Sequence, residues 1–174
     1  MAVPNAVPEY IWSSLTQNDK ETYLKLKESF YYSNSPILCK EKDKSTFPSE
    51  LETIRAYIDS DSIGVEERSI AVGISFQPSF LSVNIQRLKI LLNRCKSSIN
   101  KGFQQINYIS EKSRVKTHVV KSIPLLSMHP EEIRQWAIRI PSKGSYDLTN
   151  NMMHMPLPQK STDIIKNINL GNDQ

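Results

Sequence analysis

The chain has 174 residues, of which 39% are hydrophobic and 23% are charged, which is typical of one soluble globular domain and excludes a large multidomain enzyme. The first ten residues lack the basic and apolar regions of a signal peptide, and no apolar run is long enough to cross a bilayer, so we expect a soluble intracellular protein without a membrane partner. The two cysteines, Cys39 and Cys95, could pair but do not make a disulfide framework, which favours a reducing compartment.

The net charge of +4 is distributed unevenly along the chain. Residues 1–60 have a net charge of −2 (7 basic against 9 acidic), residues 61–120 have +5 (9 against 4) and residues 121–174 have +1 (6 against 5). Between Arg87 and Lys121 there are nine basic residues and one acidic residue, a net charge of +8. A cluster this local is typical of a solvated surface or of a site for a polyanion such as nucleic acid.

Residues 1–15 contain two prolines and no apolar periodicity, which predicts a loosely ordered lead-in to the domain. Helices are then expected at 16–33, 47–58 and 65–74. Thr16 can cap the first of them, and a proline occupies the first turn of the second, where it costs no hydrogen bond.

The clearest periodic signal lies between Leu81 and Ile99, where apolar residues recur in steps of 4, 3, 4, 3 and 4. This spacing predicts one amphipathic helix from Ser79 to Ile99, with short polar side chains opposite the apolar face and basic residues at its margins. A turn at 76–79 separates it from the helix at 65–74, as in a helix-turn-helix motif. Taken alone, the periodicity favours an ordinary surface helix, because amphipathic helices are far more common than nucleic-acid readers.

Gly102 is predicted to end this helix. The apolar stretches at 103–109 and 115–120 then predict a β-hairpin with a charged loop, which would be a wing beside the recognition helix. An exposed basic hairpin without a partner fits the local pattern equally well. A short helix is expected from Pro130, and another at 161–170 in a polar carboxyl-terminal segment.

Residue patterns for catalysis or metal binding are missing from the sequence. The three histidines, His118, His129 and His154, lie far apart and lack Cys or carboxylate partners at metal-ligand spacing. There is no Gly-rich phosphate loop and no Gly-x-Ser-x-Gly turn, and Glu131 and Glu132 fit the first turn of a helix better than acid–base chemistry. We therefore expect a protein that is not an enzyme and that has no metal, cofactor or small-molecule substrate.

Four segments carry a resemblance to a known family: FPSELETIRAYI (47–58), RSIAVGI (68–74), SFLSVNIQRL (79–88) and NKGF (100–103). Their succession resembles the initiator-binding domain family, winged-helix transcription factors of parasitic protists that recognise the core-promoter initiator element. The resemblance implies a winged helix in which the segment from Ser79 enters the major groove.

Three positions in the third segment are informative about this resemblance. Asn84 matches an asparagine of the family pattern, whereas Gln86 and Arg87 stand where the pattern has an arginine and an acidic residue. This departure concerns the base preference and not the docking mode. Larger family members carry a separate carboxyl-terminal domain that engages RNA polymerase II, and we expect no comparable domain within these 174 residues.

In helix-turn-helix docking, the amino-terminal turns of the second helix reach base edges, and nearby polar or cationic side chains contact phosphates. The predicted base-edge residues are Ser79, Ser82, Val83, Gln86 and Arg87. The predicted phosphate contacts are Lys89, Asn93, Arg94, Lys96, Lys101, Lys112, Arg114 and Lys116.

The sequence thus predicts a mainly α fold: a winged helix-turn-helix with a three-helix core, a small β-hairpin wing and a C-terminal helical extension. We expect a lead-in at 1–15, the DNA-binding domain at 16–140 and a polar extension at 141–174. The predicted function is that of a nuclear, sequence-specific transcription factor that binds double-stranded DNA at a core-promoter element, with the transcription machinery as a further partner. Two alternatives remain: a helical interaction module whose basic face binds an acidic protein, and a winged helix that binds structured RNA.

Overall fold

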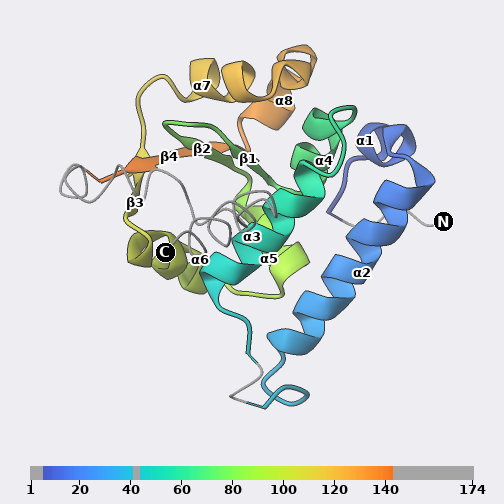
Figure 1. Ribbon diagram of the computed structural model, residues 1–174. Coiled ribbons are helices and arrows are strands. Elements are labelled where there is room, and N and C mark those ends of the chain that lie inside the picture. The colour runs from blue at the N-terminus through green and yellow to red at the C-terminus, as the bar shows by residue number, and fades with distance from the viewer. Residues whose placement is uncertain (1–5, 41–43, 143–174) are drawn as a thin grey trace, which may run out of the picture.

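The computed structural model describes residues 6–40 and 44–142, in which helices surround a four-stranded antiparallel sheet (Figure 1). In chain order the elements are α1 (Glu9–Ser14), α2 (Gln17–Ser33), α3 (Phe47–Ile58), α4 (Val65–Val72), β1 (Ile74–Phe76), β2 (Leu81–Val83), α5 (Ile85–Leu92), α6 (Lys96–Gln105), β3 (Tyr108–Glu111), α7 (Val115–Ser122), the 3-10 helix η2 (Pro124–Met128), α8 (Pro130–Ile133) and β4 (Ala137–Pro141). The predicted fold class, mainly helical with a small β wing, is confirmed. The helix expected at 161–170 falls outside the described residues.

The helices of the amino-terminal half begin where their sequence signals predict. Thr16 Oγ1 accepts a hydrogen bond from the backbone N–H of Asp19 at 3.1 Å, which caps α2, and the Thr46 side chain caps α3 in the same way. Ahead of α2, the short helix α1 places Ile11 and Trp12 in the core, at 1% and 2% exposure. Apolar contacts therefore anchor this part of the lead-in to the domain.

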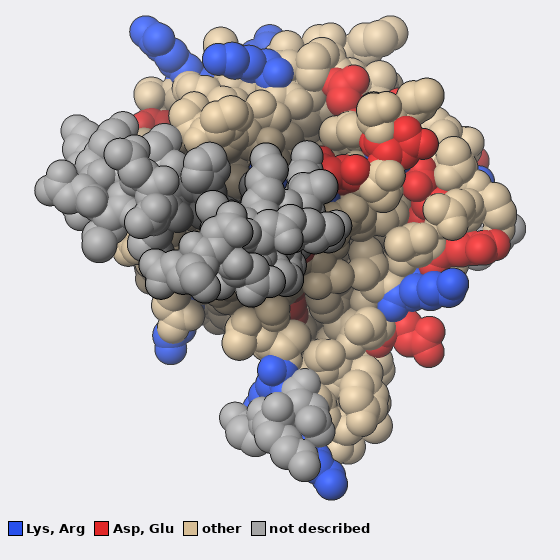
Figure 2. Space-filling view, viewed as in Figure 1, with Lys and Arg blue, Asp and Glu red and all other residues tan. Residues whose placement is uncertain are grey.

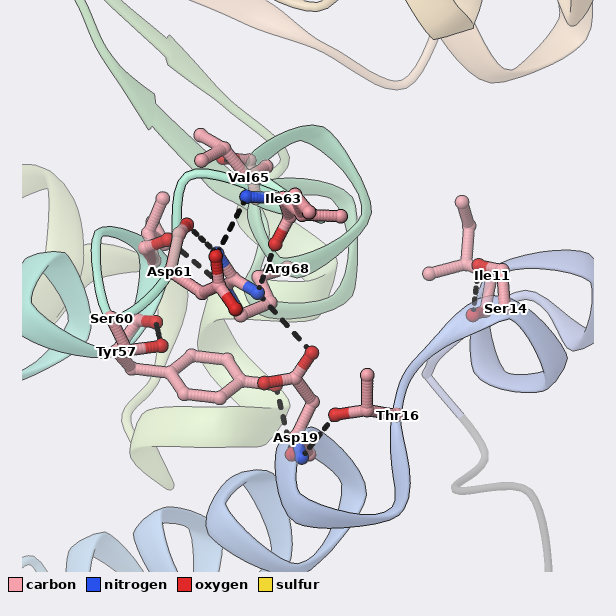
Figure 3. Close-up of polar contacts among 12 residues, drawn as sticks. Ile11, Ser14, Thr16, Asp19, Tyr57, Ser60, Asp61, Ile63, Val65 and Arg68 are labelled. Carbon is pink, nitrogen blue, oxygen red and sulfur yellow. Dashed lines mark hydrogen bonds and ion pairs between the residues drawn. The ribbon is translucent and has the colours of Figure 1, made fainter.

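Arg68 joins α2 to the loop between α3 and α4 from a buried position. Its Nη1 donates to Asp19 Oδ2 at 3.2 Å and to the Ile63 carbonyl at 2.9 Å (Figure 3). Its Nε donates to the Ile58 carbonyl at 3.0 Å, and its Nη2 donates to the Asp61 carbonyl. A buried guanidinium is stable only when its donors find acceptors, so these contacts fix the loop around Arg68.

The segment between α4 and α5 is a β-hairpin and not the helix end and turn that the periodicity predicted. Gly73 ends α4 in the left-handed region, with φ of +89°. A Cβ atom at Gly73 would lie 2.8 Å from the Asn84 carbonyl oxygen and 2.8 Å from Arg87 Cβ, so only glycine lets α5 pack this closely. Strand β1 then pairs antiparallel with β2, and Ile74 lies opposite Val83.

The helix predicted at 79–99 is wrong, because this stretch contains strand β2, all of α5 and only the beginning of α6. Asn84 caps α5, since its Oδ1 accepts a hydrogen bond from the backbone N–H of Arg87 at 3.3 Å. The helix ends at Leu92, and Asn93 adopts a left-handed conformation with φ of +52°. The apolar steps of 3 and 4 continue across this turn, so periodicity could not reveal the break.

Gly102 lies inside α6 and does not end a helix as predicted. A Cβ atom there would lie 2.5 Å from the Phe47 ring, so the missing side chain lets α6 approach α3, where Phe47 and Phe103 meet edge to face. Cys95 is one of the residues in the apolar series between Leu81 and Ile99, yet it is exposed, and both it and Cys39 are free cysteines.

The second strand of the predicted wing hairpin, at 115–120, is wrong. Strand β3 pairs instead with β4, with Tyr108 opposite Pro141, and the sheet order is β1-β2-β4-β3. The stretch expected to be a strand belongs to α7, where Val119 and the following Ile123 are spaced by one helical turn and are both fully buried. Helices α7, η2 and α8 are therefore inserted between the two wing strands, and Figure 1 shows them together at one end of the sheet.

Candidate nucleic-acid interface

A helix-turn-helix motif is formed by α5, a turn at 93–95 and α6, and the two helices pack against each other. Strand β3 follows α6 directly and β4 returns beside it, so a wing follows the motif as in a winged helix. The second helix of the motif is therefore α6 and not the stretch at 79–99. In this docking mode the second helix is the one that enters the major groove.

Helix α6 separates apolar from polar side chains along its length. Ile99, Gly102 and Phe103 are buried in the core. The exposed or half-exposed positions are Lys96, Ser97, Ser98, Asn100, Lys101, Gln104 and Gln105. This outer face has no acidic residue, and its hydroxyl and amide groups can both donate to and accept from base edges while the lysines neutralise phosphates. Its chemistry therefore suits duplex DNA.

The turn before α6 is held to α3 by a partly buried ion pair. Arg94 Nε donates to Glu50 Oε1 at 2.7 Å, and Arg94 Nη1 donates to Ser98 Oγ at 3.2 Å. The second oxygen, Glu50 Oε2, accepts hydrogen bonds from Asn34 Nδ2 at 2.6 Å and from Ser45 Oγ at 3.1 Å. Burial raises the pKa of Glu50, although these donors oppose the shift. The start of α6 is thus fixed relative to α2 and α3.

Three of the predicted base-edge residues are wrong, because their side chains are buried. Ser82 and Val83, at 0% and 1% exposure, lie in β2, and the Ser82 hydroxyl is 2.7 Å from that of Ser122. Arg87 is 5% exposed and forms an ion pair with Glu132 of α8. Strand β2 and the inner side of α5 are core positions in this fold, so none of these side chains can meet a base.

The other two predicted base-edge residues are exposed but lie outside α6. Ser79 belongs to the turn between β1 and β2, and Gln86 to the first turn of α5. Both therefore precede the second helix of the motif. The structure does not test a DNA contact by either side chain.

Most of the predicted phosphate contacts are available at the surface. The exposed ones are Asn93, Lys96, Lys101, Lys112, Arg114 and Lys116, with Lys89 half exposed. They lie in the helix-turn-helix motif and at the beginning of the inserted helical segment. Arg94 differs from the prediction, because it is engaged with Glu50 and its side chain is only 20% exposed. It holds the motif together and is not placed to contact phosphate.

Charge is separated on the surface as the sequence pattern indicated. Figure 2 shows basic side chains along the upper edge, where α7 lies, and most of the visible acidic side chains on the right, where α1, α2 and α4 lie and where some basic side chains accompany them. The one acidic residue of the basic stretch, Glu111, accepts a hydrogen bond from the backbone N–H of Ser113, which lowers the pKa of its carboxyl group. A polyanion would therefore be attracted more strongly to the edge where α7 lies than to the side where α1, α2 and α4 lie.

Sequence reasoning missed Ser97, Asn100 and Gln104, which α6 presents on its outer face. A signal for them exists in the sequence. Asn93 is of the residue type that, after glycine, most readily ends a helix in the left-handed conformation. A new amphipathic helix after that break would have placed these polar residues on the second helix of the motif.

Two features are absent from the described ranges, 6–40 and 44–142. No helix there is both long and apolar enough to cross a membrane. The same residues include no group of three or more His, Cys, Asp or Glu side chains that could hold a metal ion.

Comparison with known protein families gives a match over most of the chain. The family described as transcription-initiator DNA-binding domain IBD matches residues 17–143, which is more than half of the chain. This match confirms the resemblance carried by the four ordered segments, and the family is one of DNA-binding domains and not of enzymes. Comparisons with curated proteins and with solved structures returned no match. The chain therefore belongs to the transcription-initiator DNA-binding domain family.

Proposed function

We propose that this protein recognises a core-promoter element of the initiator type in double-stranded DNA, with α6 in the major groove. The observation that carries the proposal is the acid-free polar face of α6, which is the second helix of the helix-turn-helix motif. Family membership supports DNA as the partner. The amide and hydroxyl groups on α6 support recognition of particular bases in addition to phosphates.

The contacts follow from the position of each side chain on α6, in the loop after β3 or at the start of α7. Base-edge contacts are assigned to Ser97, Asn100, Lys101 and Gln104. Phosphate contacts are assigned to Lys96, Lys112, Arg114 and Lys116. In this proposal residues 16–140 form the DNA-binding domain, between a lead-in at 1–15 and a polar extension at 141–174.

Two glutamines provide a matched test of which helix reads the bases. The preferred duplex is first selected from a random library, and the affinities of the variants for this duplex and for a scrambled one are then measured. Gln104→Ala on α6 should lose roughly 1–3 kcal/mol on the selected duplex and little on the scrambled one. Gln86→Ala on α5, also exposed, should bind both duplexes like the wild type. The reverse result would assign base reading to α5 and contradict the proposal.

The two alternatives, an acidic protein partner and structured RNA, differ from the proposal in competition and salt dependence. Unlabelled duplex should displace labelled duplex more effectively than structured RNA or heparin does. The logarithm of the binding constant should fall linearly with the logarithm of salt concentration, and Lys96→Ala, which removes an assigned phosphate contact, should reduce this slope by about 1. Equal competition by heparin would favour an interaction module, and stronger competition by RNA would favour an RNA-binding winged helix.

A core-promoter function also requires the protein to act in the nucleus, with the transcription machinery as a further partner. The full chain carrying a fluorescent tag should accumulate in nuclei. Exclusion from nuclei at all stages of growth would contradict this part of the proposal.

A further inference from the structure

Arg139 of β4 reaches across to the polar face of α6. Its Nη2 donates a hydrogen bond to Asn100 Oδ1 at 2.6 Å, and its guanidinium carbon lies 4.7 Å from the centre of the Phe103 ring. The backbone at Arg139 is held in the sheet on both sides, opposite Leu81 of β2 and Ser110 of β3. The guanidinium therefore approaches Asn100 from a rigid strand and rests on an aromatic ring beneath it.

This contact determines which way the Asn100 amide faces. A guanidinium has only donors, so the amide atom that meets it must be the oxygen. The amide nitrogen, Nδ2, must then point away from Arg139. The side chain is half exposed and lies between two exposed residues of the same helix, Lys96 one turn before it and Gln104 one turn after it. Its free end is consequently on the side of α6 that we assign to DNA.

An asparagine that can use both amide atoms pairs best with adenine, because adenine offers the acceptor N7 beside the donor N6 in the major groove. With Oδ1 already occupied by Arg139, Asn100 has two N–H donors to offer and a less available acceptor. Guanine presents two acceptors, N7 and O6, on the same edge, whereas cytosine presents a donor. The Arg139 contact therefore favours guanine over adenine and cytosine.

We propose that Arg139 is a specificity-determining residue: by holding Asn100 Oδ1, it makes Asn100 a donor that selects guanine at one position of the DNA site. The inference rests on the proposed function, since it requires α6 in the major groove. Arg139 itself acts through Asn100 and is a positioning residue. Arg139 is half buried, and desolvation lowers the pKa of its guanidinium. Both observations fit a side chain that contacts other protein groups and not DNA.

The test compares base frequencies in duplexes selected from a random library by the wild type and by three variants. Arg139→Met keeps an apolar stem over Phe103 but removes the donor, and Arg134→Met, at an exposed arginine, is the control. The wild type and the control should select guanine at the position read by Asn100. Arg139→Met should change that position to adenine, with about a tenfold change in the ratio of the two affinities. Other positions should be unaffected.

Asn100→Asp provides a second measurement that does not depend on removing the arginine. Its carboxylate has no donor, so guanine should be lost and cytosine, which presents an amino group, should be favoured. Circular dichroism melting checks that each variant is folded. Unchanged base frequencies in folded Arg139→Met, or in folded Asn100→Asp, overturn the inference while leaving DNA recognition intact. A wild type without any sequence preference overturns the proposed function, and the inference with it.

Discussion

Replacement of Glu50 by alanine should destabilise the protein by about 3 kcal/mol. The Glu50 side chain is fully buried, and its two oxygens accept hydrogen bonds from Arg94, Asn34 and Ser45. Removal of one partner of a buried ion pair costs about 3–5 kcal/mol, because the remaining charge stays desolvated. The lower end of that range applies here, since the Arg94 side chain is 20% exposed and can regain part of its hydration in the variant.

Urea unfolding at neutral pH, followed by circular dichroism, measures this loss. The matched control is Glu52→Ala, which removes a half-exposed glutamate from the same helix and should change the free energy of unfolding by less than about 0.5 kcal/mol. A loss of 3 kcal/mol also corresponds to a fall of roughly 6–12 °C in Tm for a chain of this size. If Glu50→Ala and Glu52→Ala agree within about 1 kcal/mol, the ion pair does not hold the turn before α6, and the reasoning is refuted.

Burial raises the pKa of Glu50 above its ordinary value of 4.5, so the native state binds more protons than the unfolded chain just above that pH. The free energy of unfolding of the wild type, relative to that of Glu50→Gln, should therefore fall as pH rises from about 4.5. Urea unfolding of both proteins across this pH range measures the difference, and a difference that does not change with pH would contradict the raised pKa. Gly73→Ala should lower the free energy of unfolding by roughly 2–4 kcal/mol, because alanine is strained in the left-handed region and its Cβ would contact the Asn84 carbonyl. Gly64→Ala is the control: its φ is similar, but its Cβ would come closest to the end of the Arg68 side chain and not to backbone, so the loss in the same assay should be smaller. Tyr57→Phe should lose about 1 kcal/mol, because the Tyr57 hydroxyl donates to a buried carbonyl at 3.0 Å; a neutral effect in thermal unfolding would contradict this.

Helices α2 and α3 could be predicted from sequence because their start signals are local. A threonine cap and its hydrogen-bond partner are three residues apart, as Thr16 and Asp19 show, so the interaction exists before any tertiary contact forms. The basic stretch and the family resemblance could also be read directly, since both are properties of residue order. They were sufficient to predict a winged-helix protein that binds DNA.

The second helix of the helix-turn-helix motif could not be located in the same way. The apolar spacing between Leu81 and Ile99 is compatible with one helix, and only the fold reveals a strand, two helices and a left-handed turn at Asn93. The structure of the wing also differs from the sequence prediction. The stretch predicted to pair with β3 forms α7 instead, with Val119 and the following Ile123 buried one helical turn apart, and β3 pairs with β4. Strand pairing is a long-range choice that local pattern does not contain.

The sequence by itself determined the fold class, the concentration of positive charge between Arg87 and Lys121, and membership of a DNA-binding family. Only the tertiary structure decided which cations can reach DNA. Arg68, Arg87 and Arg94 look alike in the sequence, yet each pairs with a carboxylate 49, 45 or 44 residues away along the chain. The partner that buries an arginine is brought to it by folding, so its role depends on distances in space that residue order does not express.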